Sequence, residues 1–265
     1  MKDSLDFGLK DKVAIVAGGG ALGQDIGNGR AASILLAEAG AKVLVVDKDK
    51  LLAETTVQMI EERGGEASWI SGDLTKSDQC KKVVDFVISK WGRLDILDNN
   101  IGVASKLSVV DESEENWDNI MDINLKPMFL MSKYAIPEMI KSGNGGSIVN
   151  ISSISATRPK GLTTYSASKG AVLSLSQAMA VDHGADGIRV NCILPGPVYT
   201  PMVYSNGMSK DHRSQRQNAS LIEIEGDGWD IGKAVVYLSS NWARYITGHL
   251  MVVDGGCSLS ARPRG

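Results

Sequence analysis

The chain of 265 residues has only three cysteines, three histidines and no long apolar run. The cysteines Cys80, Cys192 and Cys257 lie far apart and are odd in number, so their spacing indicates neither a disulfide framework nor a cysteine metal site. No pair of histidines has the spacing of metal ligands, and we expect no catalytic metal. We interpret the cysteines as reduced thiols in a reducing compartment.

The sequence also lacks blocks of like charge and a segment for membrane insertion. Its 28 basic and 31 acidic residues give a net charge of −3 without a run of five or six like charges, so binding to nucleic acid or to a membrane surface has no electrostatic support. Because no stretch reaches about 18 apolar residues, we expect no membrane-spanning helix. The polar residues 1–12 do not form a secretory signal, and we expect a cytoplasmic protein.

What is present is a regular alternation of short apolar runs with longer amphipathic stretches. Runs such as 13–17 and 42–46 are each followed by a helical pattern of ten residues or more. Because this alternation is typical of βαβ units, we predict an α/β fold: a doubly wound parallel sheet of about seven strands with helices on both faces. No linker interrupts the pattern, so residues 1–265 are predicted to form a single domain. Helices are expected at 30–39, 51–63, 77–90, from 117 past 129, from 165 to 184 and at 230–239.

The alternation breaks between about residues 201 and 226, and we predict that this segment forms a lid over the substrate. Ligands of parallel α/β sheets bind beyond the carboxyl ends of the strands. The lid's apolar side chains form either a pocket wall or ordinary packing, and its cationic ones either attract an anionic substrate or are merely solvated. These side chains are Met202, Tyr204, Met208 and Leu221, and Lys210, Arg213 and Arg216.

A glycine-rich turn follows the first predicted strand, in the sequence AGGGALGQDIGNGRAASILLAEAGA. Glycines let the backbone approach a pyrophosphate closely, and the amino terminus of the following helix offers free N–H groups. The strand before the turn and the helix after it indicate a dinucleotide site, although a glycine-rich surface turn is the alternative.

Asp47 ends the second predicted strand, 18 residues past Gly29. A carboxylate at this place can bind both ribose hydroxyls of NAD, and it would repel the 2′-phosphate of NADP. Lys48 and Lys50 either soften this preference or form the solvated start of a helix. We therefore predict NAD as the cofactor.

Further motifs follow the glycine loop in a fixed order. They are Gly72-Asp73-Leu74, Asn99-Asn100-Ile101-Gly102, Asn124 in MDINL, Ser153 in IVNISS, Tyr165 and Lys169 in YSASK, Pro195-Gly196 with Thr200, Ile246-Thr247-Gly248 and Val253-Asp254-Gly255-Gly256. From about residue 12 to residue 256, this order resembles the short-chain dehydrogenase/reductase family in its single-domain Rossmann-fold form. The resemblance implies interconversion of a secondary alcohol and a ketone, and a homotetramer.

The family's site residues map onto this sequence one by one. The resemblance implies that Tyr165 is the general acid or base, that Ser153 binds the substrate oxygen, and that Asn124 holds a water linking Lys169 to solvent. Lys169 lies one helical turn from Tyr165, so its ammonium can favour the phenolate, and the resemblance implies that it also holds the nicotinamide ribose. The residues expected to bind the cofactor are Gly18, Gly27, Asn28, Gly29, Asp47, Asp73, Leu74, Asn100, Gly102, Tyr165, Lys169, Pro195, Gly196, Val198 and Thr200.

Two features depart from the family's pattern. The glycine motif fits best on Gly18, Gly27 and Gly29, which makes the loop about five residues longer than usual; a rival placement uses Gly19, Gly23 and Asp25. The catalytic serine stands 12 residues before Tyr165, where 13 is common. Spacing favours Ser152, but strand register favours Ser153, which we prefer because adjacent residues of a strand point to opposite faces.

The histidines, two possible pocket residues and the alternative functions complete the interpretation of the sequence. His183 is expected as a helix-end cap and His249 as a structural residue of the last strand, whereas His212 could touch substrate. Ser105 and Lys106 are candidates for the pocket lining. A dinucleotide sensor or scaffold without catalysis is the alternative function, because the same fold serves many roles. A lyase or epimerase with bound NAD is a third, although such relatives have longer chains.

Overall fold

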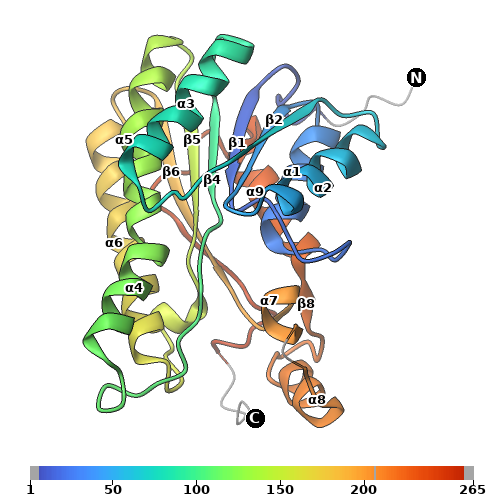
Figure 1. Cartoon of the computed structure of the whole chain (residues 1–265), viewed down its shortest axis with the longest axis vertical. Coiled ribbons are helices and arrows are strands. Elements are labelled where there is room, and N and C mark those ends of the chain that lie inside the picture. The colour runs from blue at the N-terminus through green and yellow to red at the C-terminus, as the bar shows by residue number, and fades with distance from the viewer. Residues whose placement is uncertain (1–5, 206, 260–265) are drawn as a thin grey trace.

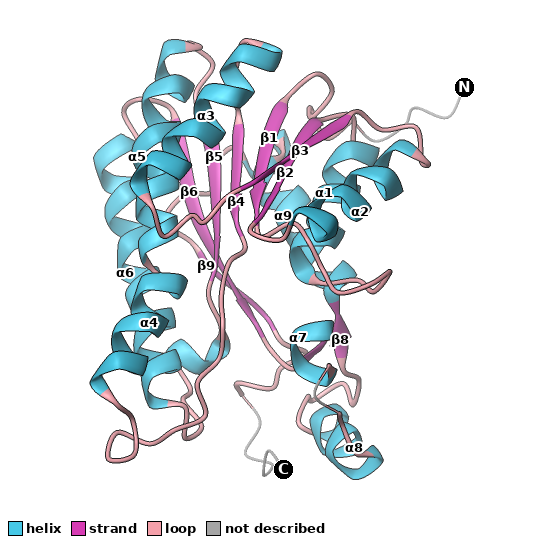
Figure 2. Cartoon of the chain, viewed as in Figure 1, coloured by secondary structure: helices cyan, strands magenta, loops and turns pink. Residues whose placement is uncertain are grey.

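A parallel sheet divides the molecule into two helical layers (Figures 1 and 2). The computed structural model describes residues 6–205 and 207–259, and within them seven strands pair in the order β3-β2-β1-β4-β5-β6-β9. Their bounds are β1 Val13–Ala17, β2 Lys42–Asp47, β3 Ala67–Ser71, β4 Ile96–Asn99, β5 Gly146–Ile151, β6 Ile188–Pro195 and β9 Leu250–Val253. The order reverses between β1 and β4, which confirms the predicted doubly wound sheet.

Helices cover both faces of this sheet (Figure 1). On one face lie α1 Asn28–Glu38, α2 Lys50–Glu61 and α9 Gly228–Ser239, and on the other lie α3 Ser77–Trp91, α4 Glu114–Asn124, α5 Lys126–Lys141 and α6 Thr163–His183. Single turns of 3₁₀ helix lie at Ile154–Ala156 and Asn241–Ala243. Because the sheet is covered on both faces, β1 reads as a continuous apolar run, VAIVA, and all five of its residues are buried.

Helices α1 and α9 of the first layer approach each other closely. A Cβ atom added to Gly232 of α9 would come within 2.9 Å of the Ala31 carbonyl carbon of α1. A side chain at 232 would therefore push α9 away from the helix that begins at the glycine loop. This contact fixes α1, whose amino terminus lies at the candidate site.

The helix expected from residue 117 past residue 129 is wrong: the chain forms two helices there, α4 and α5, with a turn at Leu125. The cause is Pro127, the second residue of α5, which has no N–H to donate to the carbonyl of Ile123. The proline therefore ends the first helix and begins the second, where the N–H is not needed.

The segment from 201 to 226 is not irregular throughout. It contains α7 Pro201–Tyr204 and α8 Lys210–Asn218, and it leads into β8 Gly226–Asp227, which pairs with β7 Val198–Tyr199 outside the main sheet. Figure 1 shows α7 and α8 beyond the carboxyl ends of the strands, where a lid would lie. Residue 206 of this segment and residues 1–5 of the polar amino-terminal segment lie outside the described residues. Among the described residues, no helix is both long enough and apolar enough to cross a membrane.

Candidate active site

Two adjoining cavities follow the carboxyl edge of the sheet. The first, of about 560 Å³, lies over the ends of β1 to β4, and the second, of about 330 Å³, lies over the ends of β5 and β6 and beside α6. They share Asn100, Ile101, Gly102 and Met202. Together they form one groove across the point where the strand order reverses, which is where ligands of doubly wound sheets bind.

The glycine turn brings the end of β1 against the start of α1. Gly27 is the N-cap of α1, and a Cβ atom on Gly29 would lie 2.0 Å from the Gly18 carbonyl oxygen, so no side chain fits there. Among the described residues, no side chain caps this helix, and its first turn holds no acidic residue. Its amino-terminal N–H groups are therefore available to an anion, as a pyrophosphate site requires.

The rival glycine placement does not fit this geometry. Gly23 and Asp25 precede the first residue of α1, Asn28, and a Cβ atom on Gly23 would meet no atom within 4 Å. The backbone at Gly23 therefore does not approach the helix as the motif requires. The placement on Gly18, Gly27 and Gly29 is the one that the structure supports.

A buried arginine, which the sequence interpretation missed, holds the extended loop. Arg30 is 0% exposed and donates hydrogen bonds to the carbonyl oxygens of Ala21 at 2.7 Å, Gly23 at 2.8 Å and Asp25 at 2.6 Å. Its Nε donates to Thr56 Oγ1 at 2.9 Å. Burial lowers the pKa of Arg30, and the carboxylates of Asp25 and Asp47 oppose this shift. The extra residues are therefore fixed in place by the helix that they precede.

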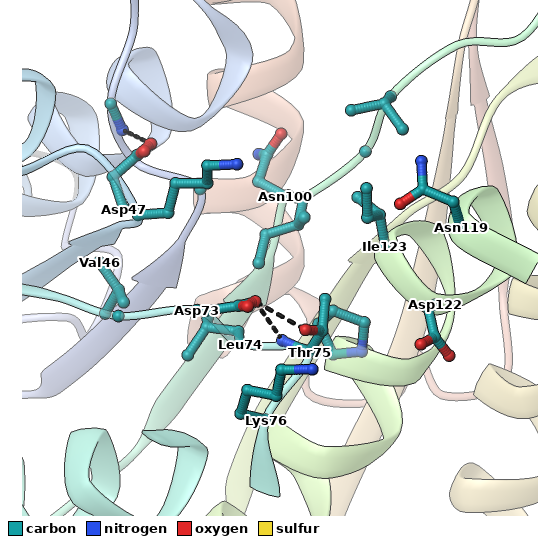
Figure 3. A pocket seen from close by; sticks show the side chains of 18 of the residues that line it. Val46, Asp47, Asp73, Leu74, Thr75, Lys76, Asn100, Asn119, Asp122 and Ile123 are labelled. Carbon is teal, nitrogen blue, oxygen red and sulfur yellow. Dashed lines mark hydrogen bonds between the residues drawn. The ribbon is translucent and has the colours of Figure 1, made fainter. Parts of the chain in front are cut away.

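Carboxylates lie at the nucleotide end of the groove (Figure 3). Asp47 accepts a hydrogen bond at Oδ2 from the Gly20 N–H at 3.1 Å. Asp73 accepts hydrogen bonds from Thr75 Oγ1 at 2.7 Å and from the Thr75 N–H at 3.0 Å. Both bonds lower the pKa of Asp73, and the bond from the hydroxyl has the larger effect. The buried Leu74 lines the same cavity. Acceptors for ribose hydroxyls and an apolar wall are thus present where an adenosine would bind.

Tyr165 and Lys169 meet in the second cavity. Both lie on α6, and Lys169 Nζ is 6.0 Å from the centroid of the Tyr165 ring. Lys169 donates to the carbonyl oxygens of Ile151 at 2.9 Å and Ile101 at 3.5 Å. Burial lowers the pKa of Lys169 to about 8, and Cys192 opposes this shift. A cation is therefore held beside the phenol.

The phenol's own pKa differs from the sequence expectation. Burial raises the pKa of Tyr165, and its hydrogen bond with Ser153 lowers it by less. The lowered pKa expected from Lys169 is thus not produced by the protein alone. A bound positive ring next to the phenol would add the missing stabilisation of the phenolate.

The two candidate serines have different surroundings. Ser152 donates its hydroxyl to the Lys169 carbonyl oxygen at 2.7 Å, a buried bond within the protein. Ser153 hydrogen-bonds with Tyr165 and lines the second cavity, which we call the catalytic cavity, and also a smaller cavity next to it. The geometry therefore favours Ser153 as the serine that binds a substrate oxygen.

Asn124 lies behind the cavity and is completely buried. Its Oδ1 accepts from the Val103 N–H at 2.7 Å, and its Nδ2 donates to the Val103 carbonyl at 2.9 Å and to Ser168 Oγ at 2.9 Å. The side chain thus fixes Val103, the residue after Gly102. A Cβ atom added to Gly102 would lie 2.9 Å from Lys169 Nζ. Asn124 reaches Lys169 through this loop and not by direct contact.

The remaining predicted residues take these places. Asn100 lines both cavities and donates from Nδ2 to Asp98 Oδ2 at 3.0 Å. The second cavity is also lined by Asn28, Pro195, Gly196, Val198 and Thr200. All predicted cofactor residues except Gly27 and Gly29, which shape the turn, therefore lie along the groove.

Of the histidines, only His212 lines a cavity of the groove. His183 ends α6 and pairs with Asp186 at 3.1 Å, and the N–H of His249 donates to Asn191 Oδ1 at 3.0 Å, one residue before β9 begins. Within the described ranges, no group of three His, Cys, Asp or Glu side chains could hold a metal ion.

Glu112 is a second residue that sequence reasoning missed, and it connects segments beside the site. Glu112 accepts hydrogen bonds from Asn116 Nδ2, from Thr164 Oγ1 at 2.6 Å and from Ser105 Oγ at 2.7 Å. These bonds lower the pKa of Glu112, in that order of size. The carboxylate thus joins the loop after β4 to the residue before Tyr165, and nothing in its local sequence indicates this long-range contact.

The chain resembles known proteins over nearly its whole length. The family described as "Enoyl-(Acyl carrier protein) reductase" matches residues 20–258. A short-chain dehydrogenase/reductase of Aspergillus oryzae, astE, is 34% identical over 96% of this chain and 97% of its own length. The cyclopentanol dehydrogenase of a Comamonas species is 34% identical over 94% of this chain and 97% of its own length.

A solved structure agrees with these sequence relatives. The crystal structure of a protein assigned to the short-chain dehydrogenases/reductases, from Burkholderia xenovorans, superimposes with a TM-score of 0.90. It is 36% identical and covers 96% of this chain and 99% of its own. The similarity therefore includes the sheet and both helical layers.

Proposed function

This chain belongs to the short-chain dehydrogenase/reductase family of oxidoreductases, and from that premise we propose that it interconverts a secondary alcohol and a ketone with NAD(H). The observation that carries the proposal is the meeting of Tyr165, Lys169 and Ser153 in one cavity that continues into a nucleotide-sized one. Proton transfer at an alcohol oxygen requires these three side chains together, whereas a scaffold protein does not.

The proposed mechanism assigns one proton movement to the protein. When bound, the nicotinamide accepts or supplies the hydride. Tyr165 takes the proton from the alcohol oxygen or returns it to the ketone oxygen, and Ser153 hydrogen-bonds that oxygen. Ser153 is buried and Tyr165 is half-buried, which limits the access of water to the reacting oxygen and strengthens these bonds.

Lys169 has two tasks in this proposal. Its ammonium has three N–H donors, and carbonyl oxygens of the described residues accept two of them, so the third is available to a ribose hydroxyl. The positive charge next to the phenol favours the phenolate during proton transfer. A water held by Asn124 would link Lys169 to solvent and carry the proton between them.

A panel of secondary alcohols with NAD tests the proposal directly. The Comamonas relative is a cyclopentanol dehydrogenase, which supports including cyclopentanol and other cyclic alcohols. Absorbance of the reduced cofactor should rise with at least one alcohol and fall with the matching ketone. Cofactor binding without turnover of any member would contradict the proposal and favour a sensor or scaffold.

The proposed NAD preference depends on Asp47. We expect a kcat/KM about 10- to 100-fold higher with NAD than with NADP, because a carboxylate close to a 2′-phosphate is repulsive even when solvent screens the pair. Asp47→Asn should reduce this ratio mainly by improving the use of NADP. Steady-state kinetics with both cofactors measures it.

The matched control for Asp47 is Asp49→Asn. Asp49 is two residues away and caps α2 by accepting from the Leu51 N–H, but it does not line the cavity. Its replacement should leave the NAD to NADP ratio unchanged. A wild-type kcat/KM that is equal or higher with NADP would show the cofactor assignment to be wrong.

We also propose a homotetramer built from the helix pair α4 and α5 and from the last strand. Large apolar side chains are exposed on these elements: Phe129 at 48%, Ile140 at 40% and Val252 at 47%. Their burial between copies would remove apolar surface from water. Light scattering after size exclusion should give four times the chain mass of 28.2 kDa, and a monomer would contradict this assembly.

A further inference from the structure

The catalytic cavity continues away from the nucleotide into a smaller chamber. This chamber, of about 170 Å³, shares Ser153, Leu162 and His212 with the catalytic cavity and extends to Gln215 of α8. None of the described glycine-loop residues lines it. It therefore lies on the substrate side of Tyr165, beyond the place for the cofactor.

The two ends of the groove differ in charge. Three aspartates, Asp47, Asp73 and Asp122, line the nucleotide cavity together with Lys48 and Lys76, whereas no described Asp or Glu lines the catalytic cavity or the chamber. Lys106 and His212 do line the catalytic cavity. Neither the Lys106 ammonium nor the His212 ring has a hydrogen-bond or ion-pair partner among the described residues. In a chain of net charge −3, this end of the groove is selectively cationic.

Two arginines of α8 share one carboxylate beside this end of the groove. Arg216 and Arg213 both pair with the buried carboxylate of Glu225, the latter at 3.6 Å, so one carboxylate serves two guanidinium groups. Arg213 also lies over the Tyr199 ring, 3.9 Å from its centroid. Arg216 lines both cavities, and Arg213, the more weakly paired of the two, lies one turn before it on α8, so the group leaves one positive charge beside this end of the groove.

We propose that the substrate carries an anionic oxygen group, a carboxylate or a phosphate, in addition to the alcohol or ketone. This inference rests on the proposed oxidoreductase function. Lys106 and His212 donate to the anion, while the reacting carbon lies at Tyr165. The side chains of Leu162, Met202 and Val203 pack against the carbon chain between the two groups. The anion takes no part in the hydride or proton transfer and is unchanged by it.

Pairs of charged and neutral ketones test the inference with NADH. The probes are 4-oxopentanoate, 5-oxohexanoate and 6-oxoheptanoate, each against its methyl ester, and dihydroxyacetone phosphate against dihydroxyacetone. We expect at least one anion to have a kcat/KM about tenfold above that of its neutral partner, and the two sets of pairs distinguish carboxylate from phosphate. Because solvent-exposed charges are screened by salt, the ratio should fall at high ionic strength.

Variants assign the preference to residues. Lys106→Gln and His212→Gln should each lower the anion-to-neutral ratio by up to about fivefold, as expected for one exposed charged contact. Lys210→Gln is the matched control, because Lys210 is exposed at the start of α8 and lines neither cavity. Its ratio should equal that of the wild type.

The outcomes separate this inference from the proposed function. Neutral ketones reduced as fast as the anions would overturn the anionic substrate and leave the oxidoreductase intact. A preference for anions that both variants retain would overturn the assignment to Lys106 and His212. If no probe, charged or neutral, is reduced while NADH binds, both the inference and the proposed reaction on small ketones fail.

Discussion

Tyr165→Phe should lower kcat by about 100- to 10,000-fold, the range that a positioned general acid or base contributes. The variant removes only the phenolic oxygen, so the aromatic ring can keep its packing on α6 beside Lys169. Binding of NAD should therefore remain within a small factor of that of the wild type. Steady-state assays with the best alcohol of the panel measure kcat, and a fluorescence titration with the cofactor measures its binding separately.

Two controls make this result specific. Tyr237→Phe removes a hydroxyl on α9, on the other face of the sheet, and should leave kcat unchanged. Ser153→Ala should lower kcat more than Ser152→Ala, because the Ser152 hydroxyl is used on the Lys169 carbonyl oxygen. Retention of more than a few per cent of kcat in Tyr165→Phe would remove the phenol from the acid–base role.

The sheet and its order of elements could be predicted because both depend on local patterns. A buried strand such as β2 is a short and mainly apolar run, and a helix that packs on the sheet, such as α2, has an apolar face. Parallel strands bring their carboxyl ends to the same edge, so motifs that follow separate strands meet in space. This is why Asp47, Asp73 and Asn100, which are far apart in the sequence, could be predicted to line one groove.

The features that could not be predicted depend on long-range contacts. Arg30 reads as an ordinary helical residue, but its side chain turns back and binds three carbonyls of the loop before it. Glu112 joins a loop to α6 across 52 residues of sequence. The turn at Leu125 has a different cause: the apolar periodicity continues through Pro127, but the missing N–H of this proline ends the helix before it.

Asp98 is an acidic residue inside a fully buried strand, where the local pattern predicts an apolar side chain. It lies in the middle of β4, directly between Val16 of β1 and Val149 of β5 in the strand register. The side chain is 0% exposed; Oδ2 accepts from Asn100 Nδ2, and Oδ1 has no partner among the described residues. Burial raises the pKa of Asp98 to about 7, and the bond from Asn100 opposes the shift. An unpaired charge would be costly there, so the carboxyl is protonated below this pH.

Asp98→Asn should therefore stabilise the protein, and the gain should grow with pH. Because the folded pKa lies above the unfolded value of about 4, the folded state holds the proton more tightly, and wild-type stability falls as the pH rises toward 7. The asparagine keeps an acceptor for Asn100 and has no proton to lose. The gain in unfolding free energy should increase by about 3 kcal/mol between pH 5 and pH 8.

Urea unfolding of both proteins at the two pH values measures this difference, and the contributions of all other titrating groups cancel in it. Asp95→Asn is a contrasting control, because Asp95 is buried but paired with Lys12 at 3.2 Å and with Arg93 at 2.5 Å. Its replacement leaves two cations without their partner and should destabilise the protein at both pH values. If Asp98→Asn gave the same change in stability at pH 5 and pH 8, the side chain would have to be ionised at both. The core beside the nucleotide groove would then contain a charge stabilised by something other than Asn100.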